Sequence, residues 1–177
     1  MNQDRELDHL VPATRVRAVE ACRMFHEVTG HRLTIYFTRR TCSDQAFLFR
    51  SGRSSEDILS KQQSLRDRGY DYLAEFITQA GPNNSSEWKT NAAPGESWHN
   101  YGEAFDAVPL VSGMIDWDNA ELWEIYGECV ILLGMTWGGK WKNVDSPHAQ
   151  RPIQGSALTG SSPEIARERL IEAGSLI

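Results

Sequence analysis

Residues 97–106 read Ser-Trp-His-Asn-Tyr-Gly-Glu-Ala-Phe-Asp, and this stretch places a histidine, a glycine and an aspartate at short spacing. The β-rich composition of residues 104–111 predicts a strand around Asp106. Gly102 can adopt backbone angles that other residues avoid, so the chain can turn sharply behind His99. A histidine at that turn and an aspartate on the strand are then placed to meet at one metal ion.

A second group of candidate residues is Asp145-Ser146-Pro147-His148. Two imidazoles and one carboxylate, from His99, His148 and Asp106, make up a three-ligand set for zinc whose fourth position stays open to water. Asp145 would lie near the same ion without having to ligate it. Each motif taken alone is also compatible with ordinary polar surface or core chemistry, so both interpretations stay open on this evidence.

The other histidines and the cysteines suggest no further site. His9, His26 and His31 have no carboxylate at ligand spacing and are predicted to be ordinary surface or helix-end residues. The three cysteines have no CxxC spacing, which argues against a disulfide scaffold or an all-cysteine metal site. The aromatic residues near the two motifs are more typical of a core than of a substrate platform: Trp98, Tyr101, Phe105, Trp137 and Trp141.

The composition is that of an ordinary soluble globular protein, with 177 residues of which 40% are hydrophobic and 24% charged. The net charge of −6 argues against nucleic-acid and membrane-surface partners, because both require a basic face. No apolar run approaches the ~18 residues of a transmembrane helix, and the polar start does not resemble a secretory signal. We expect one domain over residues 1–177, made in a reducing cytoplasm.

Apolar spacing predicts five helical segments. They cover residues 13–29, 43–52, 56–80 (a pair broken at Gly69), 119–133 and 163–173. The predicted buried faces are Val16, Val19, Cys22 and Phe25 in the first segment, and Leu122, Ile125, Cys129 and Leu132 in the fourth. Asp118 is the predicted N-cap of the fourth segment, because Glu121 follows three residues later.

Strand patterns are fewer. Alternating or β-rich segments predict strands at residues 33–38, 104–111, 135–137 and 148–153. Helices and strands are mixed without regular βαβ alternation, which favours an α+β domain.

Three ordered motifs resemble those of the zinc D-Ala-D-Ala carboxypeptidase superfamily. Ser97-x-His99-x-x-Gly102-x-Ala104-x-Asp106 is similar to its SxHxxGxAxD signature. Trp137-Gly138-Gly139-x-Trp141 followed by Asp145-x-Pro147-His148 resembles the second signature of its L-alanyl-D-glutamate endopeptidase branch, the branch of phage endolysins. Upstream, Thr38-Arg39-Arg40-Thr41 through Gln45 and Gly52-Arg53 is similar to the family's arginine-bearing strand end and its Q…GR helix. The resemblance covers roughly residues 7–153.

The resemblance implies a Hedgehog/DD-peptidase-type α+β fold, with a small antiparallel sheet and surrounding helices. It also implies zinc held by His99, Asp106 and His148, with Asp145 as the catalytic carboxylate. Arg40 would face the substrate and stabilise an oxyanion or hold a carboxylate. Ser97 would support a substrate or metal-ligand hydrogen bond, although capping of the local turn explains it equally well.

The chain also departs from the family pattern. Lys140 stands where relatives often have an acidic residue, and Ala149 stands where an aromatic residue is common; both changes bear on substrate fit. Residues 54–88 replace a brief connection of many relatives and are interpreted as an inserted helical hairpin and loop. Packing is the simpler role for this insertion, and a lid or wall-recognition role is the alternative.

The resemblance predicts a zinc peptidase that cuts peptidoglycan stem peptides between L-Ala and D-Glu. The expected role is that of a single-domain, monomeric phage endolysin, made without a signal peptide and acting on the cell wall after release. A D-alanyl-D-alanine carboxypeptidase or dipeptidase is the alternative enzyme. A zinc-structured binding module without catalysis is a third hypothesis, which the presence of both Asp145 and Arg40 argues against.

Overall fold

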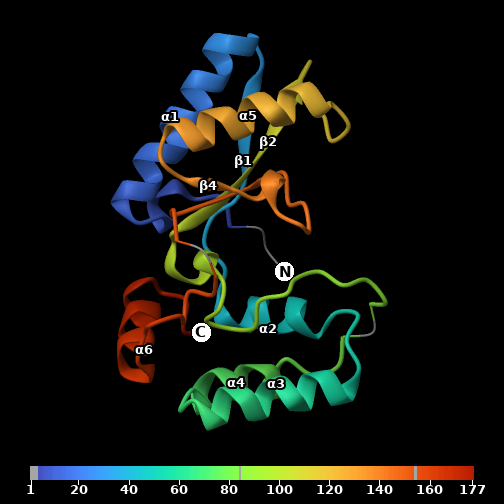
Figure 1. Ribbon diagram of the computed structural model, residues 1–177, viewed down its shortest axis with the longest axis vertical. Helices are drawn as coiled ribbons and strands as arrows, with labels where there is room; N and C mark the ends of the chain where they lie inside the picture. Colours follow the sequence, from blue (N-terminus) through green and yellow to red (C-terminus); the bar gives the residue numbers. More distant parts are fainter. Residues whose placement is uncertain (1–3, 84, 154) are drawn as a thin grey trace. The chain divides into compact units, whose positions relative to one another are not determined.

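The computed structural model describes residues 4–83, 85–153 and 155–177 (Figure 1). The start at residues 1–3 and position 84 of the expected insertion lie outside the described residues. Two compact units can be distinguished. A sheet unit comprises the described parts of residues 2–39 and 102–154, and a helical unit comprises residues 40–101 and 155–177.

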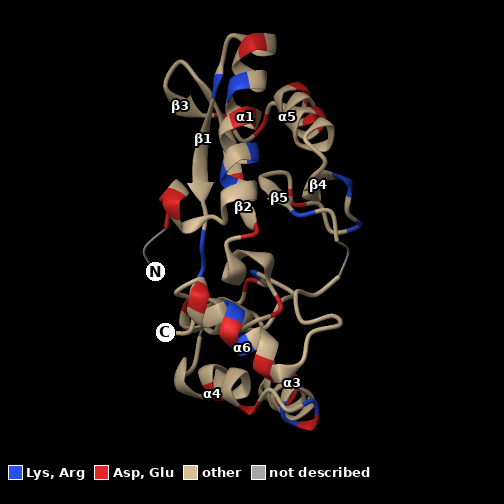
Figure 2. Ribbon diagram, turned by 90° about the vertical axis from the view of Figure 1, so that its left-hand side faces the viewer, with Lys and Arg blue, Asp and Glu red and all other residues tan. Residues whose placement is uncertain are grey.

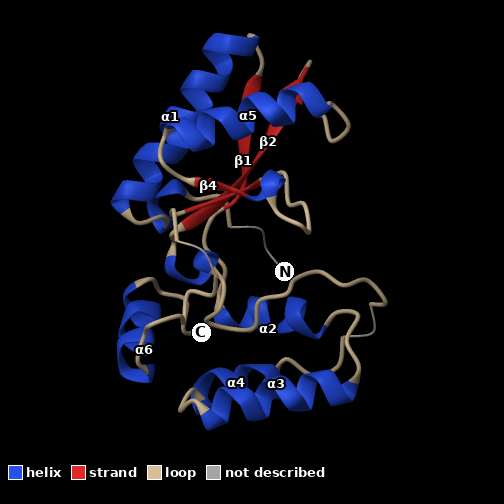
Figure 3. Cartoon of the chain, viewed as in Figure 1, coloured by secondary structure: helices blue, strands red, loops and turns tan. Residues whose placement is uncertain are grey.

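The sheet unit is built on antiparallel strands in the order β1-β2-β5-β4, with β3 paired to β2. Figure 3 draws the strands in red and the helices in blue. The strands are β1 Arg32–Phe37, β2 Ala104–Val111, β3 Met114–Ile115, β4 Thr136–Trp137 and β5 His148–Gln150. The short 3-10 helices η1 Leu7–His9 and η3 Gly138–Lys140 belong to the same unit. Strand β5 ends three residues earlier than predicted, and β3 was not predicted.

Helices α1 Pro12–Thr29 and α5 Ala120–Leu132 pack beside each other against this sheet (Figure 1). The core between them is apolar and includes Phe25, Phe105, Val108, Tyr126 and Val130. Pro12 occupies the first turn of α1, where its missing N–H costs nothing. Gly30 ends α1 in the left-handed conformation that glycine tolerates best.

The predicted faces of these two helices were partly wrong. Val16 and Val19 of α1 are exposed, whereas Ala18 and Ala21 are buried with Phe25. Alanines lie on the buried face because α1 packs closely on its neighbours. The prediction chose the face with the larger apolar residues, the valines, and was wrong for that reason. In α5, Leu132 is exposed, while Leu122 and Cys129 are buried as predicted.

The cap of α5 also differs from the prediction. Asn119, not Asp118, is the N-cap, and its side-chain oxygen accepts a hydrogen bond from the backbone N–H of Leu122. The backbone N–H of Asp118 instead donates to the Asp116 carboxylate, which places Asp118 in the preceding turn. Asparagine and aspartate are both good N-caps, so composition alone could not separate them.

The helical unit contains α2 Cys42–Arg50, α3 Ser55–Asp67, α4 Asp71–Gln79, η2 Trp98–Tyr101 and α6 Pro163–Glu172. Thr41, Ser54 and Ser162 cap α2, α3 and α6 by accepting backbone N–H groups of the first turn. The expected hairpin is present as α3 and α4, separated at Gly69 with a positive φ of 82°. Its side chains Leu65, Leu73 and Ile77 are fully buried, so the hairpin carries part of this unit's core.

The α+β class with a small antiparallel sheet is therefore confirmed. Within the described residues, no helix is long and apolar enough to span a membrane. Acidic and basic residues are interspersed along α1 (Figure 2), where Arg23 forms ion pairs with Glu20 and Glu27.

Candidate metal and catalytic site

Asp106 and His148 are brought together by the pairing of β2 with β5. The two residues are direct antiparallel partners, and side chains of such partners project from the same face of a sheet. Nδ1 of His148 lies 3.2 Å from Oδ1 of Asp106. Two ligands of one tetrahedral zinc ion are roughly 3.3 Å apart, given bonds of about 2.0–2.1 Å, so this pair has the spacing that a shared ion requires.

His99 completes a set of three. It lies in η2 and is buried, and the structure groups it with Asp106 and His148, with one ligand atom from each residue lying within 4.8 Å of the others. Two imidazoles and a carboxylate are ligands that zinc commonly takes in catalytic sites. The residues predicted as metal ligands therefore fit the ion chemically and lie within reach of one another.

The protonation of His148 reflects this environment in the absence of a metal. Burial lowers its pKa, but the hydrogen bond and charge of Asp106, the charge of Asp145 and the contact with Gln150 outweigh burial. The net result is a pKa above the ordinary value of 6.5. A zinc ion and a proton would thus compete for this imidazole.

Local contacts within the helical unit hold His99. Its carbonyl oxygen accepts the backbone N–H of Arg40 at 3.1 Å. The fully buried Asn100 donates from Nδ2 to the Arg40 carbonyl at 2.8 Å, and its Oδ1 accepts the N–H of Gly95 at 3.0 Å. Asn100 is a structural residue that sequence reasoning missed, because its partners are backbone atoms and the Arg40 carbonyl lies 60 positions away in the chain.

Ser97 takes a local role. Its hydroxyl oxygen accepts the backbone N–H of His99 at 3.4 Å, and its carbonyl accepts the N–H of Asn100. This geometry is that of a turn cap. The alternative role of Ser97 in substrate binding stays a prediction.

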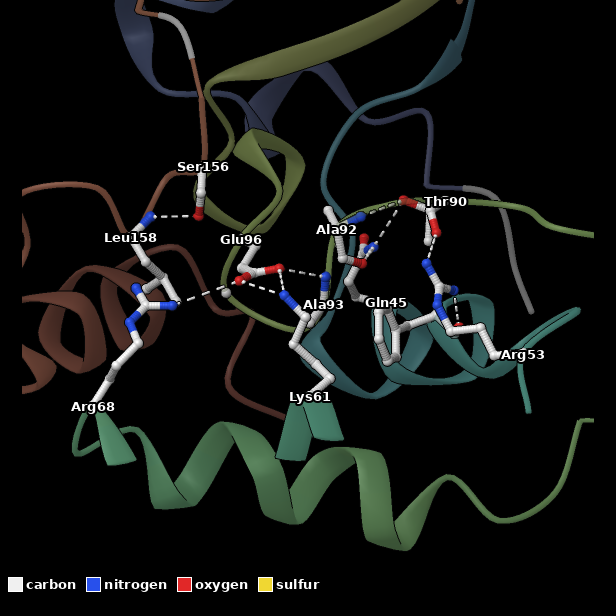
Figure 4. A network of polar contacts seen from close by, with 12 residues as sticks. Gln45, Arg53, Lys61, Arg68, Thr90, Ala92, Ala93, Glu96, Ser156 and Leu158 are labelled. Atoms are coloured by element: carbon white, nitrogen blue, oxygen red, sulfur yellow. Dashed lines mark hydrogen bonds and ion pairs between the residues drawn. The ribbon is translucent and has the colours of Figure 1, made fainter. Parts of the chain in front are cut away.

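The predicted arginine, Arg40, is oriented by a buried glutamine, Gln45, which Figure 4 shows beside Ala92. Nη1 of Arg40 donates to Oε1 of Gln45 at 3.0 Å, and Nε2 of Gln45 donates to the Ala92 carbonyl at 2.7 Å. Gln45 is fully buried, so its amide cannot exchange these partners for water. The Q…GR motif therefore contributes a residue that fixes the Arg40 guanidinium.

The remaining arginine of that motif is structural. The guanidinium of Arg53 lies between the rings of Phe49 and Trp88, 3.8 and 3.7 Å from their centroids. It also donates to the Thr90 carbonyl at 2.5 Å (Figure 4). A Cβ atom at Gly52 would lie 2.7 Å from the backbone nitrogen of Trp88, which explains the glycine.

The two glycines after Trp137 allow close packing around the Asp145–His148 segment. A Cβ atom at Gly138 would lie 2.5 Å from the carbonyl oxygen of Asp145, and one at Gly139 would lie 2.1 Å from the Trp137 indole. The indole N–H of Trp137 donates to the Ser146 carbonyl at 2.7 Å. The Trp-Gly-Gly motif is thus a packing support for the segment that carries Asp145 and His148.

Asp145 itself is exposed, whereas His148 three residues later is buried. The backbone N–H of Asp145 donates to the Gly138 carbonyl, and its own carbonyl accepts the N–H of His148. The fully buried Tyr126 donates to the Pro147 carbonyl at 2.9 Å, and burial raises its pKa well above the ordinary value, so it remains a donor. Asp145 is therefore a solvent-accessible carboxylate on a fixed backbone.

The aromatic residues divide as follows. Trp98, Tyr101, Phe105 and Trp137 are buried, as the core interpretation predicts. Trp141 is 37% exposed and its ring lies 5.0 Å from the His148 ring, so it is not a core residue.

Lys140, expected to affect substrate fit, pairs with Glu124 at 2.7 Å.

The other histidines lie where they were expected. His9 pairs with Asp4 at 2.7 Å, and His26 contacts the carbonyl of His31 at 3.0 Å. His9 and His26 are exposed.

Comparison with known proteins agrees with the motifs. Residues 90–151 match a protein family described as D-alanyl-D-alanine carboxypeptidase. Over 71 residues the chain is 39% identical to the peptidoglycan L-alanyl-D-glutamate endopeptidase CwlK of Bacillus subtilis (strain 168), an alignment that covers 34% of this chain and 42% of CwlK. The chain thus spans less than half the length of this curated relative. These two matches confirm the resemblance to the superfamily and to its L-alanyl-D-glutamate endopeptidases.

Among solved structures, the L-Ala D-Glu endopeptidase ChiX of Serratia marcescens aligns with a TM-score of 0.44 and 16% identity. This alignment covers 83% of the present chain and 87% of ChiX.

Proposed function

We propose that the protein is a zinc-dependent peptidoglycan hydrolase that cleaves the bond between L-Ala and D-Glu in the stem peptide. The observation that carries the proposal is the grouping of His99, Asp106 and His148 with ligand atoms within 4.8 Å of one another. The exposed carboxylate of Asp145, three residues before His148, adds a proton acceptor. The resemblance to L-alanyl-D-glutamate endopeptidases selects the substrate.

In this mechanism His99, Asp106 and His148 hold the zinc ion. When bound, zinc would acidify a water molecule and polarise the scissile carbonyl. Asp145 accepts the proton of the attacking water and passes it to the leaving amine, as a general base and then a general acid. Asp145 is exposed, so its carboxylate is accessible to solvent and to a substrate.

Arg40 supplies substrate recognition in the proposal. D-Glu continues the stem through its side-chain carboxyl, so its α-carboxyl group is free, or amidated in some walls. A planar guanidinium binds such a carboxylate through two parallel hydrogen bonds. Gln45 holds one edge of the Arg40 guanidinium and so limits the directions from which a substrate carboxylate can approach.

A second candidate, the release of terminal D-Ala by a D-alanyl-D-alanine carboxypeptidase, is favoured by the description of the family that matches residues 90–151. A carboxypeptidase needs its cation placed for a chain-terminal carboxylate rather than for a carboxylate beside an internal bond. The products of digestion separate the two candidates.

We extend the proposal to biological role. The likeness of the Trp-Gly-Gly and Asp-x-Pro-His motifs to those of phage endolysins supports an enzyme that lyses a host from within by digesting its wall in the host periplasm. We expect it to act as a monomer. Lysis of cells that produce the protein together with a pore-forming partner would test this role. Production without lysis would contradict it.

The test of zinc-dependent catalysis uses purified peptidoglycan. We expect release of soluble fragments to stop when a chelator removes the metal and to resume when zinc is restored. His148→Ala should lose both zinc and activity, whereas His26→Ala, a matched change at an exposed histidine, should retain both. Full zinc content in His148→Ala would contradict the ligand set, and zinc binding without hydrolysis would favour the non-catalytic module.

A further inference from the structure

Gln150 lies beside His148 and has no part in the proposed chemistry. The two residues are two positions apart on β5, so their side chains leave the same face of the strand. Both are buried, with 5% of Gln150 and 7% of His148 exposed. Oε1 of Gln150 lies 3.0 Å from Nε2 of His148.

A second contact determines which end of the glutamine amide faces the histidine. Nε2 of Gln150 donates to the backbone carbonyl of Ile153 at 3.0 Å. Because the NH₂ group is used there, the carbonyl oxygen faces the ring and can only accept. Nε2 of His148 must therefore carry the proton in this contact.

This arrangement leaves the other ring nitrogen of His148 directed at the carboxylate. Nδ1 lies 3.2 Å from Oδ1 of Asp106, at the spacing of two ligands that share one ion. The glutamine thus orients the ring from one side, and the only remaining nitrogen faces Asp106.

The geometry points to Gln150 as a positioning residue that makes Nδ1 of His148, rather than Nε2, the metal donor. This inference rests on the proposed function in one respect, since it takes His148 to be a zinc ligand. A partner that holds the second N–H of a ligating histidine fixes the tautomer and the ring orientation, and its removal commonly costs about 10–100-fold in metal affinity. The Gln150 amide is itself held by the backbone carbonyl of Ile153, so its orientation does not depend on another side chain.

The first experiment measures zinc affinity by competition with a chelator, with zinc alone as the probe. Gln150→Leu removes the acceptor and should weaken zinc binding about 10–100-fold. Gln150→Glu keeps an oxygen acceptor toward the ring and should retain most of the affinity. Gln63→Leu, on the exposed surface of α3, is the matched control and should bind zinc like the wild type.

The second experiment observes the imidazole directly by ¹H–¹⁵N NMR of the wild-type protein. On addition of zinc, the Nδ1 resonance of His148 should show coordination while Nε2 keeps its proton. Coordination through Nε2 would overturn the inference, as would wild-type zinc affinity in folded Gln150→Leu. If Gln150→Leu does not fold, the wild-type spectrum decides alone.

The two proposals fail in different ways. A protein that binds zinc through Nδ1 but leaves peptidoglycan uncut would support the role of Gln150 and contradict the proposed function. A wild-type protein that binds no zinc would overturn both.

Discussion

Around His148, the residues that hold the imidazole ring differ from the residue that is proposed to accept a proton. Asp106 and Gln150 contact the two ring nitrogens directly. Asp145 is exposed. Its backbone carbonyl accepts the N–H of His148, and its charge helps to raise the pKa of His148. Loss of Asp145 should therefore affect chemistry without removing a metal ligand.

Asp145→Ala is expected to keep about one zinc per chain and to lose roughly 100-fold or more in turnover, the size of a general-base contribution. Metal analysis and initial rates on a soluble stem peptide would measure both quantities. Asp145→Asn should behave in the same way, because it preserves shape but cannot accept the proton. Hydrolysis at the wild-type rate in either variant would show that Asp145 is not the base.

The raised pKa of His148 predicts a pH-dependent stability of the metal-free protein. A histidine whose pKa rises on folding contributes stability that is fully present below its unfolded pKa of about 6.5. That contribution disappears as the pH rises through the folded value. The free energy of unfolding lost in Asp106→Asn should therefore shrink between pH 6 and pH 9.

Denaturant titrations with chelator present would measure this dependence, with Asp8→Asn at an exposed ion pair as the control. If the free energy of unfolding lost in Asp106→Asn does not change with pH, the stabilising interaction between Asp106 and His148 is contradicted.

At the scale of elements, the α3–α4 hairpin is connected to the histidine motif through Glu96. Lys61 of α3 lies 3.1 Å from both oxygens of the Glu96 carboxylate, which also accepts the N–H of Ala93 at 3.0 Å (Figure 4). Arg68 adds a longer ion pair of 3.8 Å. Only 10% of the Glu96 side chain is exposed. The hairpin therefore packs as part of its unit, and a role in wall recognition stays a prediction.

A double-mutant cycle can test this connection. Lys61→Met and Glu96→Gln should show a coupling of about 1 kcal/mol in the free energy of unfolding, since the carboxylate is mostly shielded from water. The matched pair Lys140 and Glu124 is about 60% exposed on both sides, so its coupling should be only about 0.3 kcal/mol. Equal couplings would contradict a special role for Glu96.

The elements themselves were mostly predictable from the sequence. Five helical segments and four strands were expected close to their observed places, because glycine, proline and capping residues mark their ends. The buried face of α1 was not predictable in the same way. Its Ala18 and Ala21 pack inward because neighbouring elements approach closely, and that approach is a tertiary effect.

The residues of the candidate site also fall into two groups, those that the sequence motifs identify and those that they do not. His99, Asp106 and His148 could be named from motifs, because metal binding requires particular residue types at particular spacings. Asn100, Tyr126 and Gln150 could not, since their partners are mostly backbone carbonyls or residues that only the fold brings near. Ordinary polar residues carry no spacing signal for such contacts.

At the scale of the whole molecule, recognition has to be local. The net charge of −6 opposes long-range attraction to an anionic wall polymer. The positive groups proposed for the site are the zinc ion and Arg40. Their combination suits a carboxylate beside the scissile bond, which is the feature that distinguishes a cut before D-Glu.

The most direct test of the central claim is mass spectrometry of peptidoglycan fragments after digestion by the zinc-loaded protein. We predict new L-Ala carboxyl termini and new D-Glu amino termini. Arg40→Lys should lose much of this activity, because an ammonium group cannot reproduce the two parallel hydrogen bonds of a guanidinium. Release of free D-Ala without new D-Glu amino termini would contradict the L-alanyl-D-glutamate endopeptidase and establish the carboxypeptidase in its place.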